Sequence, residues 1–257
     1  MQRYFVAQEN FGTNSVQIQG DDAFHIQNVM RAKLGDHIIV ANGIGQETIA
    51  EIVVLSKGAV EASYLELTSS AGEARVEVWV AQALPKGDKM ETVIQKGTEI
   101  GANRFIPFTS ERTIVQYDAK KEAKRVERWA RIAKEAAEQA HRGRIPSIEP
   151  VATWRELLAM VPHATVAFIC YEKENAQQFR KLLQAVLSKD LASNCNHKPV
   201  QIMLIVGPEG GLTEGEIREA EQAGCRTISL GRRILRTETA AMVGLSCILY
   251  ESGEIGG

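Results

Sequence analysis

The sequence predicts an α/β protein whose C-terminal domain has a parallel sheet and whose N-terminal domain is a small β-barrel. In roughly the first seventy residues, short apolar runs alternate with glycine-bearing turns, a pattern typical of a barrel of short strands. Beyond residue 72, strands alternate with helices, which is the pattern of a parallel sheet with crossover connections. Two late strands also run straight into glycine-rich loops. We therefore predict two domains, residues 1–71 and residues 72–257.

In the N-terminal domain, the expected strands are separated by turns and interrupted by one helix. The helix is predicted over residues 22–31, because acidic residues that cap helices stand at its beginning. The polar stretch over residues 68–73 is typical of a linker. The clearest strands are predicted over residues 15–18, 37–41 and 52–55.

The C-terminal domain is predicted as strands and helices in alternation. A helix over residues 89–100 is expected to end at Gly101, because glycine commonly follows a helix C-terminus. A long charged helix over residues 119–141 is followed by Gly143 and Pro146, which mark its end. The strands are expected over residues 76–84, 104–108, 165–169, 202–206 and 228–230, and further helices over residues 213–223, from Thr153, after Asn175 and from Thr237.

Composition limits the classes of function. The chain has 257 residues, of which 44% are apolar and 24% charged, close to the average of globular proteins. The formal net charge is −2, so any nucleic acid must be held by local basic patches. The four cysteines form no CxxC pair, and we expect no metal site and no disulfide framework. Because neither a signal-peptide pattern nor a membrane-length apolar run is visible, we expect a cytoplasmic protein with no membrane partner.

Two glycine-rich loops are the strongest sign of a ligand site. An apolar run ending at Val206 leads into Gly-Pro-Glu-Gly-Gly-Leu-Thr at residues 207–213, and a second strand leads into residues 231–241. Loops after parallel strands meet at one sheet edge, where α/β proteins bind small molecules. On spacing alone, each loop taken singly favours an ordinary tight turn between strand and helix, because such glycine turns are common in α/β folds.

Known phosphate-binding loops fit residues 207–213 poorly. A P-loop needs Lys-Ser/Thr after its last glycine, whereas Leu212 and Thr213 follow here, and Glu209 would repel phosphate. A dinucleotide fingerprint belongs to the first strand–helix unit of its domain, and this loop comes late in the chain. A neutral or cationic ligand with a nucleoside part and a carboxylate fits better. S-adenosylmethionine meets this description, but the loops alone do not require it.

Three blocks of the sequence resemble one family of enzymes. They are residues 83–101, residues 207–213 and residues 230–240. Together they are similar to the SPOUT methyltransferases, and among these to the family that methylates N3 of a uridine in small-subunit (16S) ribosomal RNA. The resemblance extends over essentially the whole chain, although that family usually has serine where Ala140 stands. A methyltransferase that uses S-adenosylmethionine to modify uridine N3 is therefore the leading hypothesis.

The resemblance implies a fold, a cofactor and partners. The C-terminal domain is expected to contain a deep trefoil knot and to bind S-adenosylmethionine, without a metal, among the knot loops. The N-terminal barrel is expected to be PUA-like and to help dock the RNA. The protein is expected to be a homodimer that acts on 16S ribosomal RNA, within the small ribosomal subunit. The residues expected to contact the cofactor are Leu84, Ile205, Gly207, Glu209, Gly210, Leu230, Gly231, Ile234, Leu235 and Thr239.

Methylation of uridine at N3 requires loss of a proton, because the imide nitrogen is a poor nucleophile until that proton leaves. The loss spreads negative charge over the flanking carbonyl oxygens, which a guanidinium would stabilise as an oxyanion hole does. Arg236 is the first candidate for that guanidinium and Arg112 the second. Glu238 is a candidate base, or a group that orients Arg236, although an acidic residue there would equally favour the start of the last helix.

The other basic residues are assigned to RNA contacts or to solvent. Helix charges such as Lys89 and Lys96 are expected to be solvated. Loops on a rigid scaffold concentrate binding groups, and purely basic clusters follow two of the expected helices. The residues predicted to contact RNA are Arg3, Arg31, Lys33, Lys86, Arg142 and Arg144.

Two alternatives remain open at this point. One is an RNA-binding or ribosome-assembly protein that keeps the fold without catalysis, against which the intact loops and the Arg236/Glu238 pair argue. The other is a knotted methyltransferase that acts on a different RNA, such as transfer RNA. No residue reveals the target nucleotide, so only the resemblance favours ribosomal RNA.

Overall fold

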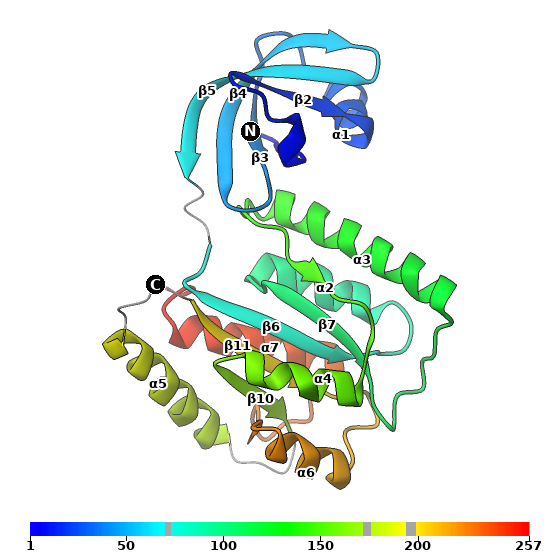
Figure 1. Ribbon diagram of the computed structural model, residues 1–257, viewed down its shortest axis with the longest axis vertical. Coiled ribbons are helices and arrows are strands. Elements are labelled where there is room, and N and C mark those ends of the chain that lie inside the picture. Colours follow the sequence, from blue (N-terminus) through cyan, green and yellow to red (C-terminus); the bar gives the residue numbers. More distant parts are fainter. Residues whose placement is uncertain (70–72, 172–175, 194–198, 257) are drawn as a thin grey trace. The chain divides into compact units, whose positions relative to one another are not determined.

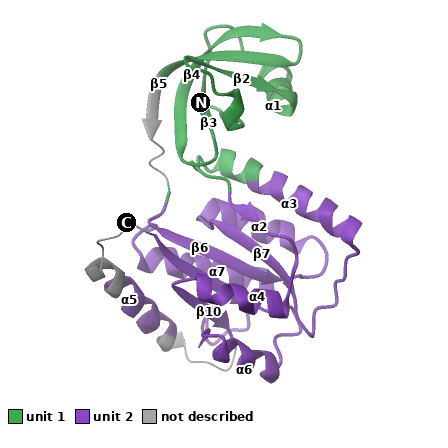
Figure 2. Cartoon of the chain, viewed as in Figure 1, with its two compact units in different colours: residues 1–73, 134–145 green, residues 74–133, 146–257 purple. Residues whose placement is uncertain are grey.

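The chain divides into two compact units, coloured separately in Figure 2. The computed structural model describes residues 1–69, 73–171, 176–193 and 199–256. Residues 1–73 and 134–145 form the first unit, and residues 74–133 and 146–257 form the second. The predicted boundary between residues 71 and 72 lies outside the described residues. The first unit therefore contains the end of the long charged helix and the loop after it, which the prediction assigned to the C-terminal domain.

The first unit is built on a five-stranded sheet with the strand order β1-β3-β4-β5-β2. The long hairpin of β4 and β5 turns at Gly58, whose φ of +78° is a conformation that glycine adopts without strain. Side chains on one face of these strands, such as Val40 and Ile52, form the core of the unit. Its elements are β1 (Arg3–Phe5), the turn Gln8–Asn10, β2 (Ser15–Gln19), α1 (Gly20–Phe24), the turn His25–Val29, β3 (His37–Ala41), β4 (Gln46–Ser56) and β5 (Ala59–Ser69).

The helix predicted over residues 22–31 begins earlier and changes its geometry. After α1 ends at Phe24, the chain continues as a π-helical turn in which Met30 N–H bonds to the carbonyl oxygen of His25. Both Ala23 and Ile26 remain buried on the face toward the sheet. Hydrophobic spacing cannot distinguish an α-helical turn from a π-helical turn over so few residues.

The second unit is built on a seven-stranded sheet in which every pairing is parallel, as predicted. The strand order is β12-β10-β11-β6-β7-β8, and β9 also pairs with β7. The strands are β6 (Val76–Ala83), β7 (Arg104–Thr109), β8 (Ser147–Ile148), β9 (Ala152–Thr153), β10 (Val166–Cys170), β11 (Val200–Val206) and β12 (Arg226–Ile228). The helices are α2 (Lys89–Ile100), α3 (Ala119–Gln139, of which residues 134–139 belong to the first unit), α4 (Trp154–Met160), the turn Val161–His163, α5 (Ala176–Ser193), α6 (Glu214–Gln222) and α7 (Thr237–Glu251).

Helices cover both faces of this sheet (Figure 1). Along β11, Met203 and Ile205 pack on the side of α4 and α6, whereas Leu204 between them packs on the side of α7. This alternation follows from the two-residue period of a strand. α7 lies so close to the strands that a Cβ atom at Gly244 would stand 2.7 Å from Leu204 Cδ2. The helix–sheet contact therefore requires glycine at that position.

Most predicted elements of the second unit agree with the structure. α2 covers the predicted residues 89–100, and Gly101 after it has a φ of +130°. Thr213 caps α6 through a reciprocal pair of hydrogen bonds with Glu216. β12 ends at Ile228, earlier than predicted, because Ser229 and Leu230 already belong to the following loop. Among the helices of the described residues, none is long and apolar enough to cross a membrane.

Candidate functional site

A cavity of about 660 Å³ lies at the carboxyl edge of the parallel sheet in the second unit. Its walls are the segments that follow β10, β11 and β12, together with the start of α7. Lys89 at the start of α2 and Arg112 after β7 complete the lining. The carboxyl ends of parallel strands meet at one edge, so loops far apart in the sequence form a single pocket. Its volume suits a small-molecule ligand.

The loop after β11 is packed tightly against its neighbours. A Cβ atom at Gly207 would stand 2.9 Å from Leu212 Cγ, and one at Gly210 would stand 3.3 Å from Arg112 Cβ. Arg112 also donates a hydrogen bond from Nη1 to the carbonyl oxygen of Gly210 at 3.0 Å. The glycines of this loop therefore serve close packing as well as turning.

The loop after β12 leaves open space beside Gly231, which lines the cavity. Gly231 has a φ of +122°, and no heavy atom lies within 4 Å of the position where its Cβ would stand. Leu230 and Leu235 line the cavity beside it, and Ile234 is 88% exposed at the same wall. A ligand can therefore approach the backbone of this loop closely and meet apolar side chains around it.

Lys89, Glu209 and Glu238 form a charged cluster that connects the start of α2, the loop after β11 and the start of α7. Lys89 Nζ lies 3.0 Å from Glu209 Oε1 and 3.7 Å from Glu238 Oε2. The backbone N–H of Lys86 also donates to Glu209 Oε1, at 3.1 Å. The hydrogen bond to Glu209 raises the pKa of Lys89. Burial raises the pKa of Glu209, but its hydrogen bonds with Lys89 and Lys86 outweigh burial and lower that pKa.

Two of the three predicted catalytic residues face the cavity. Arg236 is exposed at the N-cap of α7 and lines the cavity, as Arg112 does. Glu238, in the first turn of α7, is 15% exposed and is not among the lining residues. Its Oε2 atom is shielded from solvent and accepts no hydrogen bond from the described residues. Glu238 thus pairs with Lys89 but does not itself form part of the cavity wall.

Most of the predicted cofactor contacts come together at the cavity. Three do not line it: Ile205 and Leu84 are buried, and Thr239 is on α7 between Thr237 and Ala240, which do line it. The apolar runs that contain Ile205 and Leu84 indicate burial but do not indicate which face of the sheet a side chain meets. The predicted residues that line it are Gly207, Glu209, Gly210, Leu230, Gly231, Ile234 and Leu235.

Sequence reasoning missed several residues of the cavity wall. The expectation that Lys89 is only a solvated helix charge is incomplete, since its partly exposed side chain also lines the cavity and pairs with two carboxylates. One signal was available, because a cation at the first position of a helix opposes the helix dipole. Tyr171, which follows β10, had no signal of its own, since only the strand order brings β10 beside β11.

The predicted RNA contacts divide into exposed and buried side chains. Arg31, Lys33 and Arg144 are exposed on the first unit, and Lys86 is exposed on the second. Arg3 and Arg142 are each only 5% exposed. Among the described residues, no group of three or more histidine, cysteine, aspartate or glutamate side chains is arranged to hold a metal ion.

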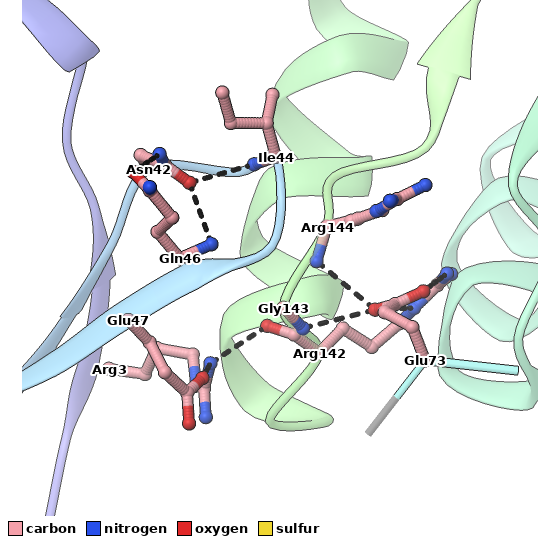
Figure 3. A network of polar contacts seen from close by, with 9 residues as sticks. All are labelled: Arg3, Asn42, Ile44, Gln46, Glu47, Glu73, Arg142, Gly143 and Arg144. Carbon is pink, nitrogen blue, oxygen red and sulfur yellow. Dashed lines mark hydrogen bonds and ion pairs between the residues drawn. The ribbon is translucent and has the colours of Figure 1, made fainter. Parts of the chain in front are cut away.

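The two buried arginines belong to a network of the first unit, shown in Figure 3. The Glu73 carboxylate accepts hydrogen bonds from Arg142 Nη2 at 2.8 Å and from the backbone N–H groups of Gly143 at 3.0 Å and Arg144 at 3.1 Å. Arg3 pairs with Glu47 and donates to the carbonyl oxygen of Arg142 at 3.0 Å. The network therefore orders the loop that carries Arg144.

Known proteins resemble the chain over nearly its whole length. Residues 72–249 match the model of the RNA methyltransferase domain, and residues 18–63 match that of the RNA methyltransferase PUA domain. Ribosomal RNA small subunit methyltransferase E of Bacillus subtilis is 39% identical over 98% of this chain and 97% of its own length. The protein of the same name in Synechocystis is 35% identical over 96% of this chain and 76% of its own length.

A solved structure has the same fold. It is the crystal structure of a ribosomal RNA small subunit methyltransferase E from Neisseria gonorrhoeae bound to S-adenosyl methionine, which is 29% identical. The match covers 97% of each chain with a TM-score of 0.81. The expected fold class, a parallel α/β domain preceded by a PUA-like domain, is thereby confirmed. The chain belongs to the RNA methyltransferase family that includes ribosomal RNA small subunit methyltransferase E.

Proposed function

We propose that this protein transfers a methyl group from S-adenosylmethionine to N3 of one uridine in 16S ribosomal RNA. The observation that carries the proposal is the cavity at the sheet edge, which is walled by the two glycine-bearing loops. A relative with the same fold is bound to S-adenosyl methionine, and curated relatives are named for the small-subunit ribosomal RNA. The choice of uridine N3 rests on the sequence blocks that resemble the N3-specific family.

The lining of the cavity fits this cofactor. The open space beside Gly231 allows the loop backbone to approach a nucleoside, and Leu230 and Leu235 offer it apolar walls. The Lys89 ammonium pairs with the Glu209 carboxylate, so the negative charge of Glu209 is already compensated at the cavity wall. The predicted contacts of Leu84, Ile205 and Thr239 would be indirect, through the strands and the helix that support these walls.

When bound, S-adenosylmethionine supplies an electrophilic methyl group, which the deprotonated N3 takes as the carbon–sulfur bond breaks and neutral S-adenosylhomocysteine forms. The protein's own residues have to bind the uridine and stabilise the charge that appears when its proton leaves. Arg236 lines the cavity and has the charge to hold a flanking carbonyl oxygen of the imide. Arg112 holds the loop at Gly210 and adds a second guanidinium to the same wall. Glu238 acts through its ion pair with Lys89.

The RNA contacts in this proposal are the exposed basic residues. Arg31, Lys33 and Arg144 of the PUA-containing unit bind phosphates, as does Lys86 next to the cavity loops. Arg3 and Arg142 contribute by ordering the loop of Arg144. From the family resemblance we also propose a homodimer and a trefoil knot formed by the loops around the cavity. A ribosomal RNA substrate in bacterial relatives further supports a cytoplasmic location.

Methylation of small ribosomal subunits from a strain that lacks this protein tests the proposal. Reverse transcription should stop at one uridine after incubation with protein and S-adenosylmethionine, because an N3-methyl group blocks base pairing. Free 16S ribosomal RNA and transfer RNA serve as parallel substrates. A stop only in transfer RNA would assign the enzyme to another RNA. Failure to bind S-adenosylmethionine at millimolar concentration in calorimetry would favour the non-catalytic RNA-binding protein.

A further inference from the structure

Lys89 occupies a position that disfavours a cation. It is the first residue of α2, where the helix dipole is positive. Its side chain is 33% exposed and lines the cavity. Glu209 at 3.0 Å, in the loop after β11, and Glu238 at 3.7 Å, in the first turn of α7, compensate for the dipole. The ammonium of Lys89 therefore joins the segments that follow β6, β11 and β12.

Glu238 is the less exposed of the two carboxylates that pair with Lys89. Its side chain is 15% exposed, and its Oε2 atom is shielded from solvent without a hydrogen bond from the described residues. A buried carboxylate oxygen in this state is unfavourable unless a charge compensates for it, and the Lys89 ammonium is the cation paired with it. Glu238 does not line the cavity, whereas Lys89 does. Lys89 is thus the member of this pair that a bound substrate would meet.

The charges of the cluster suit a neutral acceptor. An ammonium has three N–H donors, and the hydrogen bond to Glu209 takes one of them. Arg236 lines the same cavity, and its charge opposes that of Lys89. A charged donor stabilises a carbonyl oxygen more strongly once negative charge has developed on that oxygen. The remaining donors of Lys89 therefore suit a neutral acceptor that becomes anionic, as a uridine imide does when its N3 proton leaves.

We propose that Lys89 is a further catalytic residue, which donates a hydrogen bond to a carbonyl oxygen beside N3 of the acceptor uridine, and that Glu209 and Glu238 position it. This inference rests on the proposed function. When the N3–H bond breaks, the proton passes to water and the electron pair stays on the imide, spread over its carbonyl oxygens. Lys89 and Arg236 stabilise that charge until methylation of N3 removes it. The hydrogen bond to Glu209 raises the pKa of Lys89, so the ammonium keeps its own proton during the step.

Four variants test this role. Lys89→Met removes the charge and the donors at similar length, and Lys89→Arg keeps both. Lys96→Met is the matched control, because Lys96 is on the same helix, pairs with Glu99 at 2.9 Å and does not line the cavity. In Lys89→Met the buried Glu238 loses its cation. The double variant Lys89→Met/Glu238→Gln therefore tests the missing donor in a protein without that unpaired charge.

The measurements separate catalysis from cofactor binding and from folding. We expect Lys89→Met and the double variant to lower kcat on small subunits by about 10²-fold, with the calorimetric Kd for S-adenosylmethionine close to that of Lys96→Met. The melting temperature of the double variant should be close to that of Lys96→Met, whereas Lys89→Met, which leaves Glu238 without its cation, should melt at a lower temperature. Lys89→Arg should recover most of kcat. Subunits reconstituted with 5-fluorouridine RNA, whose N3 proton is more acidic, should show a smaller defect in Lys89→Met.

Three results would overturn the inference. They are an unchanged kcat in Lys89→Met, a loss of cofactor affinity as large as the loss of kcat, and a defect of equal size on both RNAs. Failure of the proposed function is a separate result, because the wild-type protein itself would then leave every uridine of the small subunit unmodified.

Discussion

The Thr237 hydroxyl donates a hydrogen bond to the carbonyl oxygen of Gly207 at 2.7 Å and so ties the start of α7 to the loop after β11. The same hydroxyl accepts a hydrogen bond from Gln82 Nε2, also at 2.7 Å. Thr237 is 7% exposed, and Gln82 at the end of β6 is fully buried. One side chain therefore links three strand ends at the cavity, and the geometry of each glycine-bearing loop depends on the other.

Replacement of Thr237 by valine should destabilise the second unit. The variant keeps the shape of the side chain but leaves the carbonyl oxygen of Gly207 and a donor of Gln82 without this partner, which costs about 1–3 kcal/mol. Urea denaturation measures the change in the free energy of unfolding. Thr237→Ser keeps the hydroxyl and serves as the control. Equal stability of the valine and serine variants would show that the hydroxyl contributes nothing.

Arg236→Ala should lower turnover far more than cofactor affinity. The guanidinium at the cavity wall is expected to stabilise charge that appears only during proton loss, so kcat should fall by about 10²–10³-fold. Single-turnover methylation and calorimetry with S-adenosylmethionine measure the two effects. Arg218→Ala, on the exposed side of α6, is the control. Equal losses in kcat and affinity would assign Arg236 to binding rather than to the chemical step.

Gly231→Ala should weaken binding of S-adenosylmethionine. The new methyl group would occupy space open toward the cavity, and the φ of +122° is unfavourable for alanine. Gly224→Ala is the matched control, because Gly224 has a φ of +102°, similar open space and no place in the cavity wall. Calorimetry should detect a loss of affinity only in the Gly231 variant. If both variants bind alike, the loop after β12 does not contact the cofactor.

Stability of the first unit should depend on the protonation of Glu138. Burial raises its pKa and the nearby Asp22 adds to this, while the N–H of Phe5 and the ammonium of Lys134 lower it in part. A carboxyl whose pKa is raised by folding contributes stability that is full below the unfolded pKa and lost as pH rises through the folded pKa.

The variant Glu138→Gln isolates this effect, because its amide oxygen can still accept the hydrogen bond from Phe5 but cannot ionise. As pH rises above about 4, the usual pKa of an unfolded glutamate, and through the raised pKa of the folded state, the free energy of unfolding of the wild type should fall relative to that of the variant. Urea denaturation across this range measures the difference, and Glu127→Gln, at an exposed position of α3, should leave it unchanged. A constant difference between wild type and Glu138→Gln would contradict the expectation.

Lys33→Ala should weaken RNA binding uniformly and reduce its dependence on salt. A phosphate contact adds about one unit to the slope of log affinity against log salt concentration, and the loss of that contact removes it. Titration of labelled 16S RNA fragments at several salt concentrations measures the slope. Lys57→Ala, at the turn between β4 and β5, is the comparison within the same unit. An unchanged slope in Lys33→Ala would exclude this phosphate contact.

Local signals account for the parts of the fold that could be predicted. α2 begins and ends at the expected residues, and α7 begins at the expected Thr237, because caps and apolar periodicity act within a few positions. The hairpin of β4 and β5 extends far beyond the strand expected over residues 52–55. Polar residues alternate with apolar ones along both strands, so the strands do not form the continuous apolar runs from which we predict strands. The membership of residues 134–145 in the first unit also has no local signal.

The sequence by itself determined the fold class, the two glycine-bearing loops and the family, because these depend on local patterns and on motif spacing. Only the tertiary structure decided which side chains meet at the cavity. The order β12-β10-β11-β6 brings Tyr171 beside the loop of Gly207. The tertiary structure also brings together the start of α2, the loop after β11 and the first turn of α7, so that Lys89 pairs with Glu209 and Glu238. Strand order and side-chain direction arise from packing of distant segments, which no window of the sequence contains.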